Sequence, residues 1–137
     1  MQTLQFAAKF ESLDEIRDFV GSMARSGGFS DKDIYNIQLA SDEAASNIIE
    51  HAYENISDGV LEISCGVTGD VITIVLVDHG ESFDPSHVPA PNVNADLSER
   101  QIGGLGLYLM RKLMDEVHYE ADTRNNRNTL TLIKHKG

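Results

Sequence analysis

The stretch Asp42–Tyr53, DEAASNIIEHAY, holds the residues around which the rest of the sequence is best understood. It is rich in alanine, has neither Gly nor Pro, and continues an apolar repeat from the residues before it, so it predicts an α-helix. Glu43, Asn47 and Glu50 stand at i, i+4 and i+7 and therefore project from one side of that helix. Carboxylate and amide oxygens in a row suit a hard cation such as Mg²⁺. A solvated helix face is the alternative, and for the stripe alone it is the more common one.

The composition is that of one globular domain with an acidic surface. The 137 residues, of which 41% are hydrophobic, suffice to bury a single core, and we expect one domain over residues 1–137. The 22 acidic residues outnumber the 11 basic ones and give a formal net charge of −11. Such a surface repels phosphate backbones and anionic lipids, so nucleic acids and membranes are not expected partners. A bound nucleotide remains compatible, because backbone amides and a metal ion can hold an anion inside a negative field.

The single cysteine is an expected core residue, and the lack of a targeting signal and of a long apolar span predicts a cytoplasmic protein. Cys65 is the single cysteine and lies in an apolar run without metal-ligand spacing, so we expect it in the core. The sequence shows neither a basic-plus-apolar N-terminal signal nor a long apolar span.

The rest of the chain predicts a two-layer α/β sandwich of the α+β class. Alternating or continuous apolar runs predict strands, and capping residues mark where helices begin. Their order predicts a mixed, mainly antiparallel sheet with helices packed on one face. The expected elements are a strand at Thr3–Phe10, a helix from the capping pattern Ser12–Glu15 to Gly27–Gly28, the motif helix capped by Ser30, strands at Val60–Val67 and Val71–Val77, a helix entered at Gly103, and strands at Val117–Asp122 and Asn128–His135.

Residues Glu81–Ile102 interrupt this pattern. All three prolines of the chain, Pro85, Pro89 and Pro91, fall in this segment among Asn, Asp, Ser and Glu residues. A connection this long without periodicity is either disordered or a functional lid, and it is not a linker between domains.

Asp78 directly follows the apolar run Val71–Val77 and is followed by His79 and Gly80. A carboxylate at the end of a buried strand is costly unless a donor reaches it, and the exocyclic amine of adenine is such a donor. Guanine has a carbonyl at the matching position and would leave the carboxylate unpaired. Gly80 has no side chain to obstruct a flat base. Taken alone, however, D-x-G is most often only a turn.

The segment Gly103-Gly104-Leu105-Gly106-Leu107 is a glycine-rich entry into a helix. Glycines at a helix start let backbone N–H groups face a phosphate, and the helix dipole favours its negative charge. Close packing of the helix is the alternative explanation for the same glycines.

Together and in this order, the motifs resemble those of the GHKL ATPase superfamily, which includes gyrase, histidine kinase and MutL-like domains. The pattern is E-x-x-x-N on a helix, strand-D-x-G, a Pro-rich lid and G-G-x-G-L, and it covers nearly the whole chain. The small size, the run Asn47–Tyr53, and the sequence Phe83-Asp84-Pro85 after D-x-G are similar to the bacterial anti-sigma-factor serine/threonine kinases. The resemblance implies the Bergerat-type ATPase fold with an ATP lid, and the binding of ATP with Mg²⁺.

The resemblance also implies roles for individual residues. Glu43 matches the general base of the family, and Asn47 matches its Mg²⁺ ligand. Asp78 matches the residue that binds adenine, with Gly80 beside the base. The segment 103–107 matches the phosphate-binding glycines at the C-terminal hinge of the lid.

Four further positions follow from the same comparison. Thr129, in the last strand, falls where such domains often carry a Thr near the base. His51 matches a family histidine, for which a packed or hydrogen-bonded role is the more common one. Ser82 replaces the second glycine of the common D-x-G-x-G pattern, which removes one flexible hinge of the lid. Arg100 either brings a positive charge near a γ-phosphate or is a solvated lid residue.

The function implied by the resemblance is that of an ATP-dependent protein serine/threonine kinase. Such kinases hold a sigma factor inactive, phosphorylate a serine on a small STAS-domain antagonist (an anti-anti-sigma protein), and exchange one partner for the other. Glu43 would accept the proton of the serine, while Mg²⁺ on Asn47 screens the phosphoryl group. Similar proteins form homodimers through the N-terminal strand and first helix.

Two other functions remain open at this level. One is a catalytically weak module that sequesters a partner and uses nucleotide only as a conformational ligand; Glu43 argues against it, because a pure binder needs no base there. The other is a stand-alone ATPase domain of a sensor histidine kinase, which would need a separate partner to supply the acceptor histidine.

Overall fold

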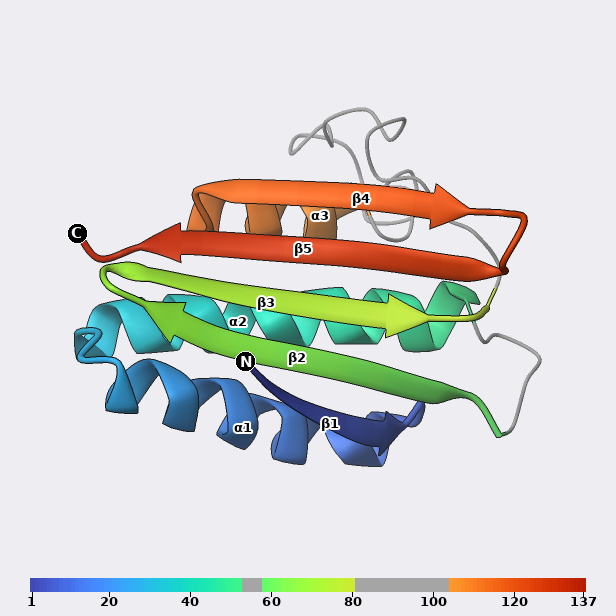
Figure 1. Cartoon of the computed structure of the whole chain (residues 1–137), viewed down its shortest axis with the longest axis horizontal. Helices are drawn as coiled ribbons and strands as arrows, with labels where there is room; N and C mark the ends of the chain where they lie inside the picture. The colour runs from blue at the N-terminus through green and yellow to red at the C-terminus, as the bar shows by residue number, and fades with distance from the viewer. Residues whose placement is uncertain (53–57, 81–103) are drawn as a thin grey trace.

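The structure is a computed structural model that describes residues 1–52, 58–80 and 104–137, with the side chains at 51–52 and 104–107 not described. Five strands form one sheet in the order β1-β2-β3-β5-β4, and the helices lie on one face of it (Figure 1). The predicted two-layer sandwich of the α+β class is therefore confirmed. Each pair of neighbouring strands is antiparallel. The elements are β1 (Gln2–Ala7), α1 (Leu13–Ser26), α2 (Asp31–Asn47), β2 (Val60–Thr68), β3 (Val71–Asp78), α3 (Gly104–Leu113), β4 (Glu116–Asp122) and β5 (Arg127–His135).

The central strands set the register that matters for function. β2 and β3 form a hairpin in which Thr68 pairs with Val71, and Gly69 in its turn has a φ of 60°, a conformation that glycine adopts without strain. On its other side β3 pairs with β5, so that Asp78, the last residue of β3, stands opposite Asn128. The end of β3 is thereby joined to the start of a strand that lies far along the chain.

The core lies between the sheet and the helices, as the alternation of buried residues along β2, β3 and β5 shows. Cys65 is fully buried in it, as expected from its apolar surroundings. Within the described residues, no helix covers the opposite face of the sheet (Figure 1). The largest fully buried apolar side chains are those of Ile16, Val20, Ile37, Leu61, Ile63, Ile72, Ile74, Leu76 and Leu132.

The start of α1 and the end of β1 differ from the sequence-based expectation, whereas the start of α2 agrees with it. The side chain of Ser30 caps α2 by accepting a hydrogen bond from the Asp33 N–H, as predicted. Ser12, predicted to cap α1, has helical backbone angles and accepts no capping bond, because a 3₁₀ turn at Phe10–Ser12 leads directly into the helix. The predicted strand to Phe10 accordingly ends at Ala7.

The motif helix also ends differently. α2 stops at Asn47 and continues as a π-helical turn over Ile48–Ala52. In a π turn each N–H reaches five residues back instead of four, so the α-helical spacing predicted for Glu50 no longer holds strictly. Such wide turns are frequent at functional sites.

Candidate functional site

The parts of the candidate site gather at one end of the sandwich. The C-terminal ends of α2 and β3 lie at this end of the molecule, and α3 has its N-terminal end directed toward it (Figure 1). α2 packs against both α1 and α3, so it is the central helix of its layer. The fold thus brings the three elements that carry these predicted site residues to one region.

Glu43 is half-buried on α2, and its environment disfavours the ionised form. Burial is the largest cause that raises the pKa of its carboxyl group, and the negative charges of Asp42 and Glu50 raise the pKa further. A carboxylate with a raised pKa is a stronger proton acceptor than an exposed one, which is the property that a general base needs.

Asn47 lies one helical turn after Glu43 and carries an unsatisfied polar atom. Its Nδ2 is buried and has no hydrogen-bond partner within the described part of the chain. A buried donor without a partner is costly and uncommon in folded proteins. An ordered water or a group of a ligand is the kind of partner that satisfies such a donor.

The residues on α2 fit a magnesium ion that is shared with phosphate groups. Mg²⁺ is usually bound through one or two protein oxygens together with substrate phosphates, rather than by an all-protein cage. Among the described residues no three His, Cys, Asp or Glu side chains converge on one point. The amide oxygen of Asn47 is a ligand of the type that this ion accepts. The unpartnered Nδ2 of the same side chain is a hydrogen-bond donor, and it would face an acceptor rather than the metal ion.

Asp78 is buried at the end of β3, with 3% of its surface exposed. Its Oδ1 accepts two hydrogen bonds, from the N–H of Gly80 at 3.0 Å and from Nδ2 of Asn128 at 2.9 Å. Burial raises the pKa of Asp78, and these two hydrogen bonds counteract that rise in part. The carboxylate thus keeps a fixed orientation in a dry environment.

Asn128 was not predicted from the sequence. It is 2% exposed and occupies the inward side of β5, in the same alternating row as Leu130 and Leu132. A polar residue in an otherwise apolar row was the available signal, because a buried amide requires partners. Its partners include Asp78 and the carbonyl of Gly80, to which Nδ2 donates at 3.1 Å.

The turn between β4 and β5 holds the middle residue of the D-x-G segment. Nδ2 of Asn126 donates to the carbonyl oxygen of His79 at 2.9 Å, and Nδ1 of His79 lies 2.9 Å from the carbonyl oxygen of Asn126. Asn126 has a φ of 50°, a conformation that asparagine tolerates better than most residues. The segment Asp78–Gly80 is therefore supported by the same hairpin over its whole length.

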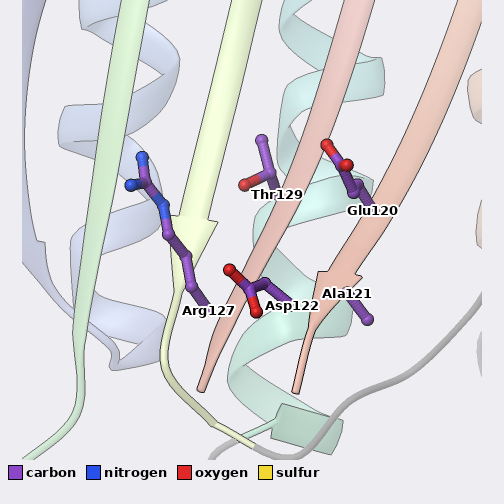
Figure 2. A pocket seen from close by; sticks show the side chains of 5 residues that line it. All are labelled: Glu120, Ala121, Asp122, Arg127 and Thr129. Atoms are coloured by element: carbon purple, nitrogen blue, oxygen red, sulfur yellow. The ribbon is translucent and has the colours of Figure 1, made fainter. Parts of the chain in front are cut away.

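Thr129 lies on the other face of the sheet. It pairs with Val77 and alternates with Asn128, so its side chain points away from the helices and from Asp78. There it lines a pocket of about 520 Å³ at the β4–β5 hairpin, with Glu120, Ala121, Asp122 and Arg127 (Figure 2). The structure does not bring Thr129 to the other predicted site residues.

The glycine-rich segment is described only in part. α3 begins at Gly104, in agreement with a helix entered at these glycines. Gly103, Ser82, Arg100 and the predicted lid lie outside the described residues, and the side chains of Leu105, Leu107 and His51 are likewise not described. The predicted phosphate contacts of this segment stay predictions.

Nearly the whole chain matches a known protein family. The profile of the histidine kinase-like ATPase domain matches residues 6–134. The chain therefore belongs to the histidine kinase-like ATPase domain family, which confirms the resemblance that the motifs indicated. Use of ATP is the common property of this family.

Within that family, the chain is similar to serine-protein kinases named RsbW. It is 39% identical over 124 residues to the protein of Bacillus licheniformis, a match that covers 85% of this chain and 75% of that protein. It is 34% identical over 125 residues to the protein of Bacillus subtilis, covering 85% and 76% of the two chains. These relatives are named serine-protein kinases, which agrees with the predicted enzyme class, an ATP-dependent protein serine/threonine kinase.

Solved structures share the fold. The chain superposes on the RsbU and RsbW domains of a Mycobacterium tuberculosis protein with a TM-score of 0.65 and 18% identity, over 98% of this chain and 32% of that longer one. It superposes on the catalytic domain of histidine kinase ThkA with a TM-score of 0.58 and 15% identity, over 99% and 97% of the two chains. In the described ranges, no helix is both long and apolar enough to cross a membrane.

Proposed function

We propose that residues 1–137 form one ATP-dependent serine/threonine kinase domain that phosphorylates a serine on a STAS-type antagonist and regulates a sigma factor by partner switching in the cytoplasm. The observation that carries this proposal is the position and state of Glu43. Its carboxyl group stands one helical turn before Asn47 on α2, and its raised pKa suits proton acceptance. A module that only binds nucleotide has no use for such a base.

Each residue has a distinct task in this proposal. Asp78 accepts a hydrogen bond from the exocyclic amine of adenine, and Gly80 leaves room for the flat base. Glu43 takes the proton of the attacking serine hydroxyl. Asn47 holds Mg²⁺, which when bound supplies positive charge to the phosphate groups. The glycines at 103, 104 and 106 present backbone N–H groups to the phosphates.

The proposed partners follow from the relatives. The curated relatives are serine-protein kinases, and the chain spans three quarters of their length, 75% for the Bacillus licheniformis protein. A sigma factor and a STAS-domain antagonist are the partners implied for this group, and a homodimer is the proposed assembly. The net charge of −11 agrees with proteins, rather than nucleic acid, as binding partners.

Phosphate transfer to a captured partner tests the proposal. The purified chain is used to capture partners from native lysate with and without ATP, and the captured proteins are identified by mass. Each is then incubated with the chain, Mg²⁺ and ATP labelled at the γ-phosphate. We expect acid-stable label on one serine of a STAS-domain protein, which a Ser→Ala change in that partner abolishes.

Two other outcomes would contradict the kinase proposal in distinguishable ways. Capture of a sigma factor with ATP bound and no transfer to any captured protein would favour the sequestration module. Acid-labile label on a histidine of a partner would favour the ATPase domain of a histidine kinase system.

A further inference from the structure

The carboxylate of Asp78 is held on one oxygen only. Gly80 N–H approaches Oδ1 from the loop that follows β3, and Nδ2 of Asn128 approaches the same atom from the neighbouring strand β5. Within the described part of the chain, Oδ2 accepts no hydrogen bond. The two oxygens of this buried carboxylate are therefore not equivalent.

The orientation of the Asn128 amide is fixed by its surroundings. Nδ2 donates to the Gly80 carbonyl oxygen as well as to Asp78, at 3.1 and 2.9 Å. A carbonyl oxygen is an acceptor only, so the amide must present its nitrogen, and not its oxygen, to these two atoms. Asn128 thus donates to both ends of the D-x-G segment at once.

We infer that Asn128 is a specificity-determining positioning residue: together with Gly80 it occupies Oδ1 of Asp78 and so leaves Oδ2 as the acceptor that reads the exocyclic amine of the base. The inference rests on the proposed function in one respect, because it takes Asp78 as the adenine-binding residue. Asn128 itself does not contact the base. It acts by fixing the rotation of the carboxylate and by keeping it ionised, since the hydrogen bond from Asn128 lowers the pKa that burial raises.

A residue that only joined β3 to β5 would behave differently. Its loss would weaken the binding of every nucleotide by a similar factor, because the whole end of the strand would move. A residue that directs Oδ2 matters only for a base that carries the amine. ATP and purine riboside 5′-triphosphate, which lacks the amine but is otherwise the same, separate these two roles.

The test compares the affinities of these two nucleotides by calorimetry, without any transfer assay. Asn128→Leu keeps the branched shape of the side chain and removes its donors, and Leu already occupies the inward positions 130 and 132 of the same strand. Asn128→Ala serves as the second variant. Asn125→Ala is the matched control in the same hairpin, because the Asn125 side chain bonds only to the exposed Asp122 in the described structure.

We expect the wild-type chain to prefer ATP over purine riboside triphosphate by about five- to a hundredfold, the loss typical of one buried hydrogen bond. In both Asn128 variants this ratio should fall by roughly fivefold or more, while Asn125→Ala keeps it. ATP affinity should also begin to fall at a higher pH in the Asn128 variants as the solution is made more acidic. The reason is that the pKa of Asp78 rises without the hydrogen bond from Asn128.

An unchanged ratio in the Asn128 variant that folds, as judged by its melting curve, would overturn the inference even if both affinities decrease. Equal affinity of the wild-type chain for the two nucleotides would instead show that Asp78 does not bind the exocyclic amine of adenine. The inference would then be wrong together with that assignment. The two failures are therefore distinguishable.

Discussion

Arg17 and Asp42 join the first two helices immediately beside the proposed base. Nη2 of Arg17 lies 3.0 Å from Oδ1 of Asp42, and the two residues come from α1 and α2. The same guanidinium lies 3.0 Å from the exposed carboxylate of Asp14, one turn earlier in α1. Asp42 directly precedes Glu43, so its charge is fixed near the carboxyl group that we propose as the base.

The pH dependence of phosphate transfer should report this arrangement. Glu43 must be ionised to accept a proton, and burial, Asp42 and Glu50 all raise its pKa. The rate of transfer should therefore decline as the pH falls, and the midpoint of this decline should lie above the ordinary pKa of a glutamate side chain. Removing a neighbouring negative charge lowers the pKa of Glu43, so Asp42→Asn should move the acidic limb of the rate profile to lower pH.

Asp14→Asn is the matched control for that measurement. It also removes a carboxylate partner of Arg17, but Asp14 is not a cause of the Glu43 shift. The acidic limb of this variant should coincide with that of the wild-type chain. Equal shifts in both variants would mean that the Arg17 contacts, and not the charge beside Glu43, determine the profile.

Asp78→Asn should separate stability from nucleotide choice. The new amide oxygen can still accept from Gly80 and Asn128, so the amide nitrogen takes the place of Oδ2 and meets the adenine amine donor to donor. ATP affinity should fall by about five- to a hundredfold. The preference for ATP over GTP should also fall, because the amide nitrogen can donate to the carbonyl of guanine. Calorimetry with both nucleotides measures the change, and an unchanged preference would contradict the role of Asp78.

The stability of the same variant has a defined sign. A carboxyl group whose pKa is raised on folding destabilises the folded state at pH values above its unfolded pKa, and this cost disappears as the pH falls and the group becomes protonated. Asp78→Asn has no such cost. Its melting temperature near pH 7 should be at least that of the wild-type chain, and the difference should shrink toward pH 4, about the unfolded pKa of an aspartate.

Asn47→Ala should weaken ATP binding without weakening the fold. The Nδ2 of Asn47 has no partner in the described structure, so its removal costs no internal hydrogen bond and relieves a buried, unsatisfied donor. ATP affinity measured with Mg²⁺ should fall together with transfer, and added Mg²⁺ should restore it only partly. A melting temperature well below that of the wild-type chain would show that Asn47 has a structural role instead.

Much of the fold follows from the sequence because its signals are local. Apolar alternation and the Ser30 cap act within a few residues, and both predict the observed strands and the start of α2. The prediction that Ser12 caps α1 is wrong, because a capping pattern does not reveal a preceding 3₁₀ turn. The π turn at Ile48–Ala52 depends on how the end of α2 packs, which the apolar repeat does not contain.

The support of the D-x-G segment could not be predicted because it depends on strand register. Asp78 and Asn128 are 50 residues apart and meet only because β3 pairs with β5 in one alignment. Successive residues of a strand point to opposite faces of the sheet. Asn128 therefore lies beside Asp78 on the helix-covered face, and Thr129 lies on the opposite face. The roles of Glu43, Asn47 and the glycine segment stay predictions.

Substitution of Glu43 tests the central claim most directly. Glu43→Gln keeps the size of the side chain and removes its ability to accept a proton, and Glu120→Gln makes the same change on the open face of the sheet (Figure 2). ATP affinity and phosphate incorporation into a captured STAS-domain protein are measured for both variants. We expect Glu43→Gln to bind ATP as the wild-type chain does and to lose transfer by roughly 10²–10⁴-fold, while Glu120→Gln retains both. Transfer by Glu43→Gln at the wild-type rate would contradict the assignment of Glu43 as the base and, with it, the proposed mechanism.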